Sequence, residues 1–77
     1  MCEYTIYGRN DCEYCIKAIN LCVHNGTSFS FINMENENIS KDQLSNKLNT
    51  QISTVPQVLF NQQYIGGSDD LENHFAA

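Results

Sequence analysis

The sequence predicts an α/β fold in which a central four-stranded mixed sheet is flanked by helices, in the order strand, helix, strand, helix, strand, strand, helix. Three observations predict it. The first half of the chain has a strand, helix, strand pattern, the second half holds two short β-rich segments separated by two residues, and helical periodicity fills the remaining segments. With 77 residues, 42% of them hydrophobic, the chain can build one small core. We therefore expect a single domain over residues 1–77.

The first half of the chain predicts two strands joined by a helix. Residues 2–7 are rich in Tyr, Thr and Ile, which favours a strand, and residues 8–11 are typical of a turn. A helix is predicted over about residues 12–24, ended by Asn25 and Gly26, and residues 29–34 are aromatic and β-branched enough for the second strand. The expected apolar stripe of this helix is Ile16, Ile19 and Val23, widened by Ala18, Leu21 and Cys22.

A capping box marks the start of the second helix. Ser40 is followed three residues later by Gln43, and Ile39 and Leu44 occupy the hydrophobic-staple positions. We predict a helix over about residues 41–49 that lies on the surface, because its apolar stripe is thin.

The last third of the chain predicts a hairpin and a short helix. Residues 55–60 and 63–65 have strand composition, with Asn61 and Gln62 as a two-residue turn. Ser68 is the expected N-cap of a helix ending near residue 75, with Asp69 and Asp70 in its first turn.

Charge and composition exclude two classes of partner. Four Lys and Arg stand against nine Asp and Glu, and the formal net charge of -5 would repel a phosphate backbone, so we expect no nucleic acid partner. Apolar runs such as residues 58–60 are far too short to cross a bilayer, so we expect no membrane association.

Location and oligomeric state are further expectations from the sequence. No leader pattern precedes the first strand, which favours a cytoplasmic location. Nothing suggests an extended interface, so we expect a monomer.

The predicted topology brings three distant segments to one end of the sheet. A strand, helix, strand unit makes its two strands parallel. If the third strand pairs antiparallel with the first, its start at Pro56 lies near Cys12, and the hairpin returns Gly67 and Ser68 to the same end. This shared cleft is the candidate site.

Cys12 and Cys15 form a Cys-X-X-Cys motif at the predicted start of a helix. The helix dipole and free N–H groups there lower the pKa of the first cysteine, so Cys12 is the expected nucleophile and Cys15 the thiol that resolves a mixed disulfide. Arg9 would favour the thiolate or hold a carboxylate. Asp11 and Glu13 act in the opposite direction, because like charge disfavours a thiolate.

A zinc site is the alternative for the two cysteines, and it needs four ligands. Cys2, Cys22 and His24 are the nearest spare ligands in the sequence apart from His74. Cys2 and Cys22 fit better as small buried hydrophobes, so we expect no metal.

Pro56 and the segment after Gly66 add possible ligand contacts to the cleft. A cis bond before Pro56 would turn the backbone of Val55 toward the cleft, where it could pair with a bound peptide. The N–H groups of Ser68 and Asp69 could bind a carboxylate while the Asp69 side chain takes a cationic amine. A ligand that carries both groups on one carbon would fit.

At these residues the chain resembles the glutaredoxin family along nearly its whole length. The matching motifs are Ile6-Tyr7-Gly8-Arg9 before Cys12-Glu13-Tyr14-Cys15, then Thr54-Val55-Pro56-Gln57, and Ile65-Gly66-Gly67-Ser68-Asp69-Asp70-Leu71. The resemblance implies a thioredoxin-like fold, a cis-proline at Pro56, and glutathione as the cosubstrate that reduces the enzyme.

The resemblance also implies residue roles. Cys12 is the nucleophile, Cys15 the resolving thiol, and Val55 offers backbone hydrogen bonds to the cysteinyl unit of glutathione. Arg9 would lie near the glycine carboxylate of glutathione. Gln43 aligns with a glutamine that contacts the glycine end in some members, and this role conflicts with the assignment of Gln43 to the capping box. The implied glutathione-binding residues are Arg9, Tyr14, Thr54, Val55, Pro56, Gly67, Ser68 and Asp69.

The chain departs from the family pattern at two positions. Glu13 stands where many members have proline, and its added negative charge should disfavour the Cys12 thiolate and shift the redox potential toward the reducing side. Ser53 replaces a frequent arginine, and this replacement would weaken glutathione binding.

The leading hypothesis is a dithiol oxidoreductase that reduces protein disulfides and glutathione mixed disulfides. Its partners would be glutathione and disulfide-containing proteins, and ribonucleotide reductase is a substrate that the family suggests but no residue here indicates. The alternatives are a small thioredoxin reduced by a flavoprotein reductase, which the absence of a Trp-Cys-Gly-Pro-Cys motif disfavours, and a zinc or iron-sulfur module.

Overall fold

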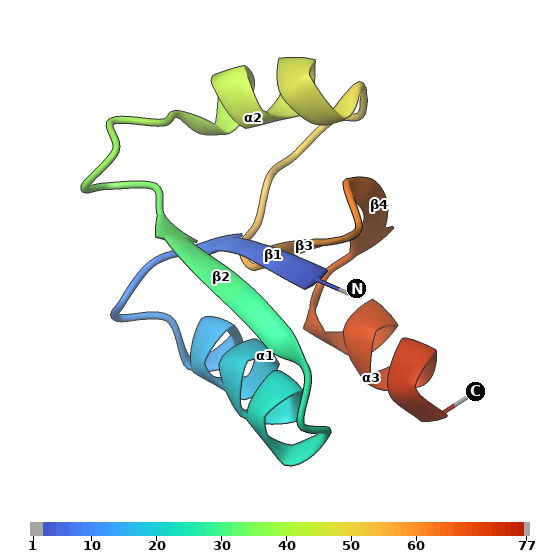
Figure 1. Cartoon of the computed structure of the whole chain (residues 1–77). Helices are drawn as coiled ribbons and strands as arrows, with labels where there is room; N and C mark the ends of the chain where they lie inside the picture. The colour runs from blue at the N-terminus through green and yellow to red at the C-terminus, as the bar shows by residue number, and fades with distance from the viewer. Residues whose placement is uncertain (1–2, 77) are drawn as a thin grey trace.

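The computed structural model describes residues 3–76, and within this range the chain forms four strands and three helices (Figure 1). The strands are β1 (Glu3–Gly8), β2 (Ser28–Asn33), β3 (Gln57–Phe60) and β4 (Gln63–Gly66). The helices are α1 (Glu13–His24), α2 (Lys41–Leu48) and α3 (Ser68–Ala76). The predicted order of elements is therefore confirmed, while Cys2, expected in the first strand, lies outside the described residues.

The sheet has the predicted mixed topology. Its strand order is β2-β1-β3-β4 in the part of the chain that the structure describes. β1 pairs parallel with β2, from Glu3 opposite Ser28 to Gly8 opposite Asn33. β1 pairs antiparallel with β3, and β3 antiparallel with β4. The antiparallel contact between β1 and β3 places the start of β3 beside the end of β1, as the candidate site requires.

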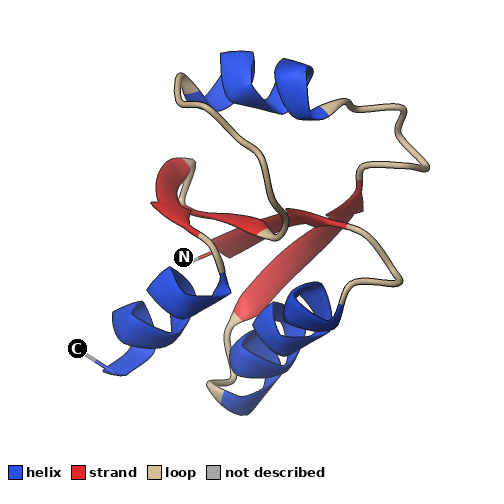
Figure 2. Cartoon of the chain, turned by 180° about the vertical axis from the view of Figure 1, so that it is seen from behind, coloured by secondary structure: helices blue, strands red, loops and turns tan. Residues whose placement is uncertain are grey.

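Helices cover both faces of the sheet, with α1 and α3 on one side and α2 on the other (Figures 1 and 2). Alternation along β1 supplies both cores, because successive side chains of a strand point to opposite faces. The core under α1 and α3 contains Tyr4, Ile6, Ala18, Cys22, Val58 and Leu71. The core under α2 contains Tyr7, Met34, Leu44, Ile52 and Leu59.

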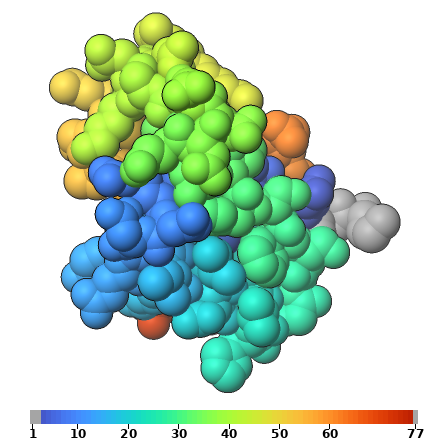
Figure 3. All heavy atoms as spheres, turned by 90° about the vertical axis from the view of Figure 1, so that its left-hand side faces the viewer, coloured from blue at the N-terminus to red at the C-terminus, as the bar shows by residue number. Residues whose placement is uncertain are grey.

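The expected apolar stripe of α1 is confirmed at Ala18 and Cys22, which are buried, and at Ile19 and Leu21, which pack against the core. It is wrong at the other two positions. Ile16 and Val23 are 49% and 63% exposed, whereas Cys15, Ala18 and Cys22 are buried. Ile16 and Val23 directly follow the two buried cysteines, so each is turned by about 100° around the helix axis from the face that meets the sheet. α1 lies on the surface on this side of the molecule, where its side chains (cyan) are seen below the loop after β1 (Figure 3).

Two predicted element boundaries shift for local reasons. β3 begins at Gln57 and not at residue 55, because Pro56 has no N–H to offer the ladder. α2 ends at Leu48, and Asn49 is its C-cap in the left-handed conformation, with φ of 55°.

The predicted hairpin turn and the predicted N-cap of α2 are confirmed. Asn61 and Gln62 form the hairpin turn with φ of 51° and 73°, the positive values that a two-residue turn of this kind requires. The Ser40–Gln43 capping box is present.

None of the helices within residues 3–76 has the length and apolar character needed to cross a membrane.

Candidate active site

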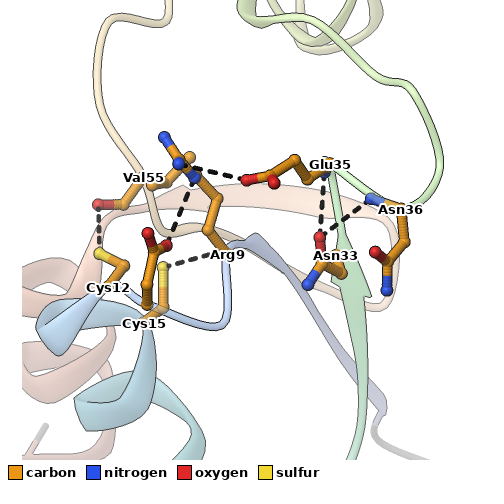
Figure 4. Close-up of polar contacts among 8 residues, drawn as sticks. Arg9, Cys12, Cys15, Asn33, Glu35, Asn36 and Val55 are labelled. Atoms are coloured by element: carbon orange, nitrogen blue, oxygen red, sulfur yellow. Dashed lines mark hydrogen bonds and ion pairs between the residues drawn. The ribbon is translucent and has the colours of Figure 1, made fainter.

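Cys12 lies at the junction of two segments that are far apart in the sequence. It is the N-cap of α1, in an extended conformation, and its side chain is partly exposed. Its Sγ lies 3.7 Å from the carbonyl oxygen of Val55, to which the thiol donates (Figure 4). The end of the β1–α1 loop therefore meets the loop that leads into β3, as the topology predicted.

Cys15 lies one turn further along α1 and is fully buried. The backbone N–H of Arg9 donates to its Sγ at 3.4 Å (Figure 4). Burial raises the pKa of the Cys15 thiol to about 11, the hydrogen bond from Arg9 partly opposes this, and the neighbouring Cys12 and Asp11 add to the rise. The structure describes Cys12, Cys15 and Cys22, and none of the three is in a disulfide.

A cleft of about 620 Å³ opens beside this dithiol. Three segments line it: the first turns of α1, the loop into β3, and the start of α3. The lining residues are Tyr14, Lys17, Thr54, Val55, Pro56, Gln57, Gly67, Ser68, Asp69 and Asp70. The structure thus brings together all the residues predicted to bind glutathione except Arg9, and Val55 belongs both to the cleft and to the contact with Cys12.

The backbone of the cleft agrees with the sequence expectations in one respect and differs in another. The Val55–Pro56 peptide bond is cis, as the resemblance implied. Ser68, expected as the N-cap of α3, is instead its first helical residue. The Asp70 carboxylate accepts a hydrogen bond from the N–H of Gly67 at 3.1 Å, which fastens the chain just before the helix.

Arg9 is not among the residues that line the cleft. Its Nε lies 3.5 Å from Asp11 Oδ1, and its Nη2 lies 3.2 Å from Glu35 Oε2 (Figure 4). Both ion pairs are solvent-exposed. Of the two carboxylates that the sequence analysis placed beside the dithiol, this arginine partly neutralises Asp11 and makes no ion pair with Glu13.

Sequence reasoning missed Lys17 as a residue of the cleft. Its Nζ lies 3.2 Å from Glu72 Oε1 and 3.7 Å from Asp69 Oδ1, so it joins α1 to α3. The hydrogen bond with Glu72 raises the pKa of Lys17. The signal was its spacing of three residues from Tyr14, because residues three apart on a helix share a side.

Gln57 is the second cleft residue that the sequence analysis did not select. Its side chain is buried although it is polar, and it bonds to residues before and after it in the chain. Its position directly after Pro56, at the start of a strand that faces the core, was the available signal.

Gln43 lies outside the cleft lining. Its Oε1 accepts from the Ser40 N–H at 2.8 Å, and its own N–H donates to Ser40 Oγ at 3.1 Å. Both partners of the capping box are thus engaged with each other.

Of the ligands weighed for zinc, Cys2 lies outside the described residues, and Cys22 and His24 lie apart from the dithiol cleft. Cys22 is buried in the core under α1 and α3, whereas His24 is exposed at the end of α1. Within residues 3–76, His, Cys, Asp and Glu side chains form no group of three or more arranged to hold a metal ion.

A dithiol at the N-terminus of the first helix, facing a cis-proline loop on a mixed sheet, defines a thiol–disulfide oxidoreductase of thioredoxin-like fold. The glutaredoxin family model matches residues 4–65. The chain belongs to the glutaredoxin family.

Individual relatives agree with this assignment. Glutaredoxin 1 of Escherichia coli K12 is 33% identical over 73 residues, which cover 88% of this chain and 86% of the relative. A glutaredoxin of Haemophilus influenzae is 32% identical over 72 residues, with 87% and 83% covered. The solved structure of reduced E. coli glutaredoxin superposes with a TM-score of 0.83 at 29% identity, over 96% of this chain and 93% of that one.

The family and the site together establish the activity. The protein is a glutathione-dependent thiol–disulfide oxidoreductase with Cys12 and Cys15 as its dithiol, and glutathione and disulfide-containing proteins are its partners.

Proposed function

We propose that Cys12 is the nucleophile of this oxidoreductase and Cys15 the resolving thiol. The difference in their environments carries the proposal. Cys12 is partly exposed at a helix N-terminus beside the cleft, a position that favours negative charge, whereas Cys15 is buried with a pKa raised to about 11. A disulfide substrate can therefore reach Cys12, while Cys15 stays protonated until a mixed disulfide has formed.

The reaction follows thiol–disulfide exchange. The Cys12 thiolate attacks one sulfur of the substrate disulfide, a bond to Cys12 forms, and the other sulfur leaves as a thiolate that takes up a proton. Cys15, after losing its proton, then attacks Cys12 Sγ, which forms the Cys12–Cys15 disulfide and releases the second substrate thiol. Two glutathione molecules restore the dithiol in two further exchanges and leave as oxidised glutathione.

The cleft is the proposed glutathione site. The backbone of Val55 pairs with the cysteinyl unit, the N–H groups of Ser68 and Asp69 bind the α-carboxylate of the γ-glutamyl unit, and the Asp69 carboxylate binds its amine. Tyr14 lines the groove together with Thr54, Pro56 and Gly67. Arg9 takes the glycine carboxylate by exchanging one of its two present carboxylate partners.

The cellular setting is also part of the proposal. We propose a cytoplasmic location, because a reducing compartment keeps the dithiol in the thiol form that attacks disulfides. A single domain over residues 1–77 is supported by the one sheet that organises residues 3–76, and we propose that the protein is a monomer. Ribonucleotide reductase as a protein substrate rests on the family resemblance alone.

Turnover of a small glutathione mixed disulfide, coupled to glutathione reductase, tests the assignment of the two cysteines. Cys12→Ser should abolish turnover of this substrate. Cys15→Ser should retain it, because glutathione itself can resolve the mixed disulfide, but should lose reduction of a protein disulfide. Cys22→Ala, at the third described cysteine, serves as the control and should keep both activities. The assignment is contradicted if Cys12→Ser still turns over the glutathione mixed disulfide, or if Cys15→Ser no longer does.

A further inference from the structure

Gln57 connects three segments behind the cleft. Its side chain is only 6% exposed. Its Nε2 donates to the carbonyl oxygen of Thr54 at 3.0 Å, and its Oε1 accepts from the hydroxyl of Tyr64 on β4. A buried amide must be hydrogen-bonded to offset its desolvation, and here both ends of the amide have partners. The side chain is therefore held in one orientation.

The bond to Thr54 determines where the next N–H points. The Thr54–Val55 peptide is planar and trans, so the Thr54 carbonyl and the Val55 N–H point in opposite directions. Because Gln57 holds that carbonyl on the side of β3 and β4, the Val55 N–H is turned away from them. The Val55 carbonyl, in turn, accepts from Cys12. Both backbone groups of Val55 are thus oriented before any ligand arrives.

Tyr64 acts on this loop through Gln57. Its hydroxyl occupies the amide oxygen, which leaves the amide nitrogen directed at Thr54. Burial and the nearby Asp70 carboxylate raise the pKa of Tyr64, so the hydroxyl keeps its proton and remains a donor at neutral pH.

We propose that Gln57 and Tyr64 are positioning residues that set the direction of the Val55 backbone for the cysteinyl unit of glutathione. The proposal rests on the glutathione site described above. A loop already held in its binding conformation spares the ligand the ordering cost that a loose loop would impose, so these two residues should act on ligand binding and not on the exchange step.

The test compares Gln57→Met, Tyr64→Phe and the double variant in the coupled assay with a small glutathione mixed disulfide. Gln57→Met keeps the length of the side chain and removes both hydrogen bonds. Gln63→Met is the matched control, because Gln63 is an exposed residue of β4 outside the cleft lining. Thermal unfolding is followed for each variant, so that a loss of folded protein is not mistaken for weaker binding.

Gln57→Met should raise the KM for the glutathione mixed disulfide about three- to tenfold, while kcat changes by less than about twofold. This rise in KM is the size expected for the loss of one or two neutral hydrogen bonds. Tyr64→Phe should shift KM in the same direction. The double variant should match Gln57→Met, because Tyr64 acts through Gln57. The control should keep the wild-type KM.

An unchanged KM, a loss confined to kcat, or additive effects in the double variant would overturn the proposal. If Gln57→Met does not fold, Tyr64→Phe decides by the same criterion, since it removes a single oxygen. The same assay distinguishes this outcome from an error in the proposed function. If Cys12 were not the nucleophile, Cys12→Ser would remain active.

Discussion

Gly8 approaches Cys15 so closely that a Cβ atom on residue 8 would lie 2.5 Å from the Cys15 sulfur. Gly8 ends β1, and Cys15 lies in the first turn of α1. The N–H of the following residue, Arg9, donates to the same sulfur. Two consecutive backbone positions at the end of β1 thus hold the second cysteine of the dithiol in place.

Replacement of Gly8 by Ala should therefore displace Cys15. The added methyl group has no room, and overpacking of this kind costs about 1–3 kcal/mol of unfolding free energy. Reduction of a protein disulfide, which requires Cys15, should fall more than turnover of a glutathione mixed disulfide. Urea unfolding and the two activity assays measure these effects.

Gly26→Ala is the control for this substitution. A Cβ on Gly26 meets nothing within 4 Å, although its φ of +64° makes the change strained. This variant should lose stability without altering the ratio of the two activities. An unchanged ratio in Gly8→Ala would show that Gly8 does not position Cys15.

Alkaline pH should destabilise the protein through Cys15. Burial raises the pKa of this thiol from 9.0 to about 11, so the unfolded chain loses the proton at lower pH than the folded chain. The unfolded state then binds fewer protons, and the free energy of unfolding should decrease as the pH rises from 9 to 11. Cys22 shifts in the same direction, so both contribute to the wild-type decrease.

The comparison of wild type with Cys15→Ser isolates the contribution of Cys15. Urea unfolding across this pH range should give a shallower decrease for the variant, because serine does not titrate there. Parallel curves for the two proteins would mean that the folded environment leaves this thiol unperturbed.

Asp69→Asn should weaken glutathione binding. Asparagine cannot offer a full negative charge to the amine of the γ-glutamyl unit, and because Asp69 is highly exposed the loss should be modest, a rise in KM of about three- to tenfold. Steady-state kinetics with a glutathione mixed disulfide provide the measurement.

Asp42→Asn removes the same charge on α2, on the opposite side of the sheet, and should leave KM unchanged. Equal shifts in the two variants would point to the overall charge of the protein and away from a specific contact of Asp69.

Gln43→Ala should affect stability and not glutathione binding. The side chain of Gln43 is engaged with the backbone of Ser40, so its loss should lower the free energy of unfolding by about 1 kcal/mol. Ser40→Ala, which removes the other half of the capping box, should have a similar effect. Chemical unfolding and KM are measured for both variants. A KM that rises in Gln43→Ala but not in Ser40→Ala would indicate that Gln43 contacts glutathione, as the family resemblance suggests.

Local patterns predicted most of the fold. The capping box at Ser40, the turn at Asn61 and the strand, helix, strand order depend on neighbouring residues, and the structure confirms them. The expected apolar stripe of α1 was wrong at Ile16 and Val23, because spacing alone cannot tell which side of a helix with many apolar residues will meet the sheet. Ile16 and Val23 fit the spacing as well as Cys15, Ala18 and Cys22 do, and only the packing of α1 on the sheet distinguishes them.

The sequence by itself determined the dithiol motif, the segments that form the cleft and the topology that brings them together. These follow from residue types, their spacing and the geometry of parallel and antiparallel pairing. Tertiary structure alone decided the burial of Cys15, the ion pairs of Arg9 and Lys17, and the contact of Gln57 with Tyr64. Such features depend on side chains from different strands, helices and loops, whose distances are set only when these elements pack.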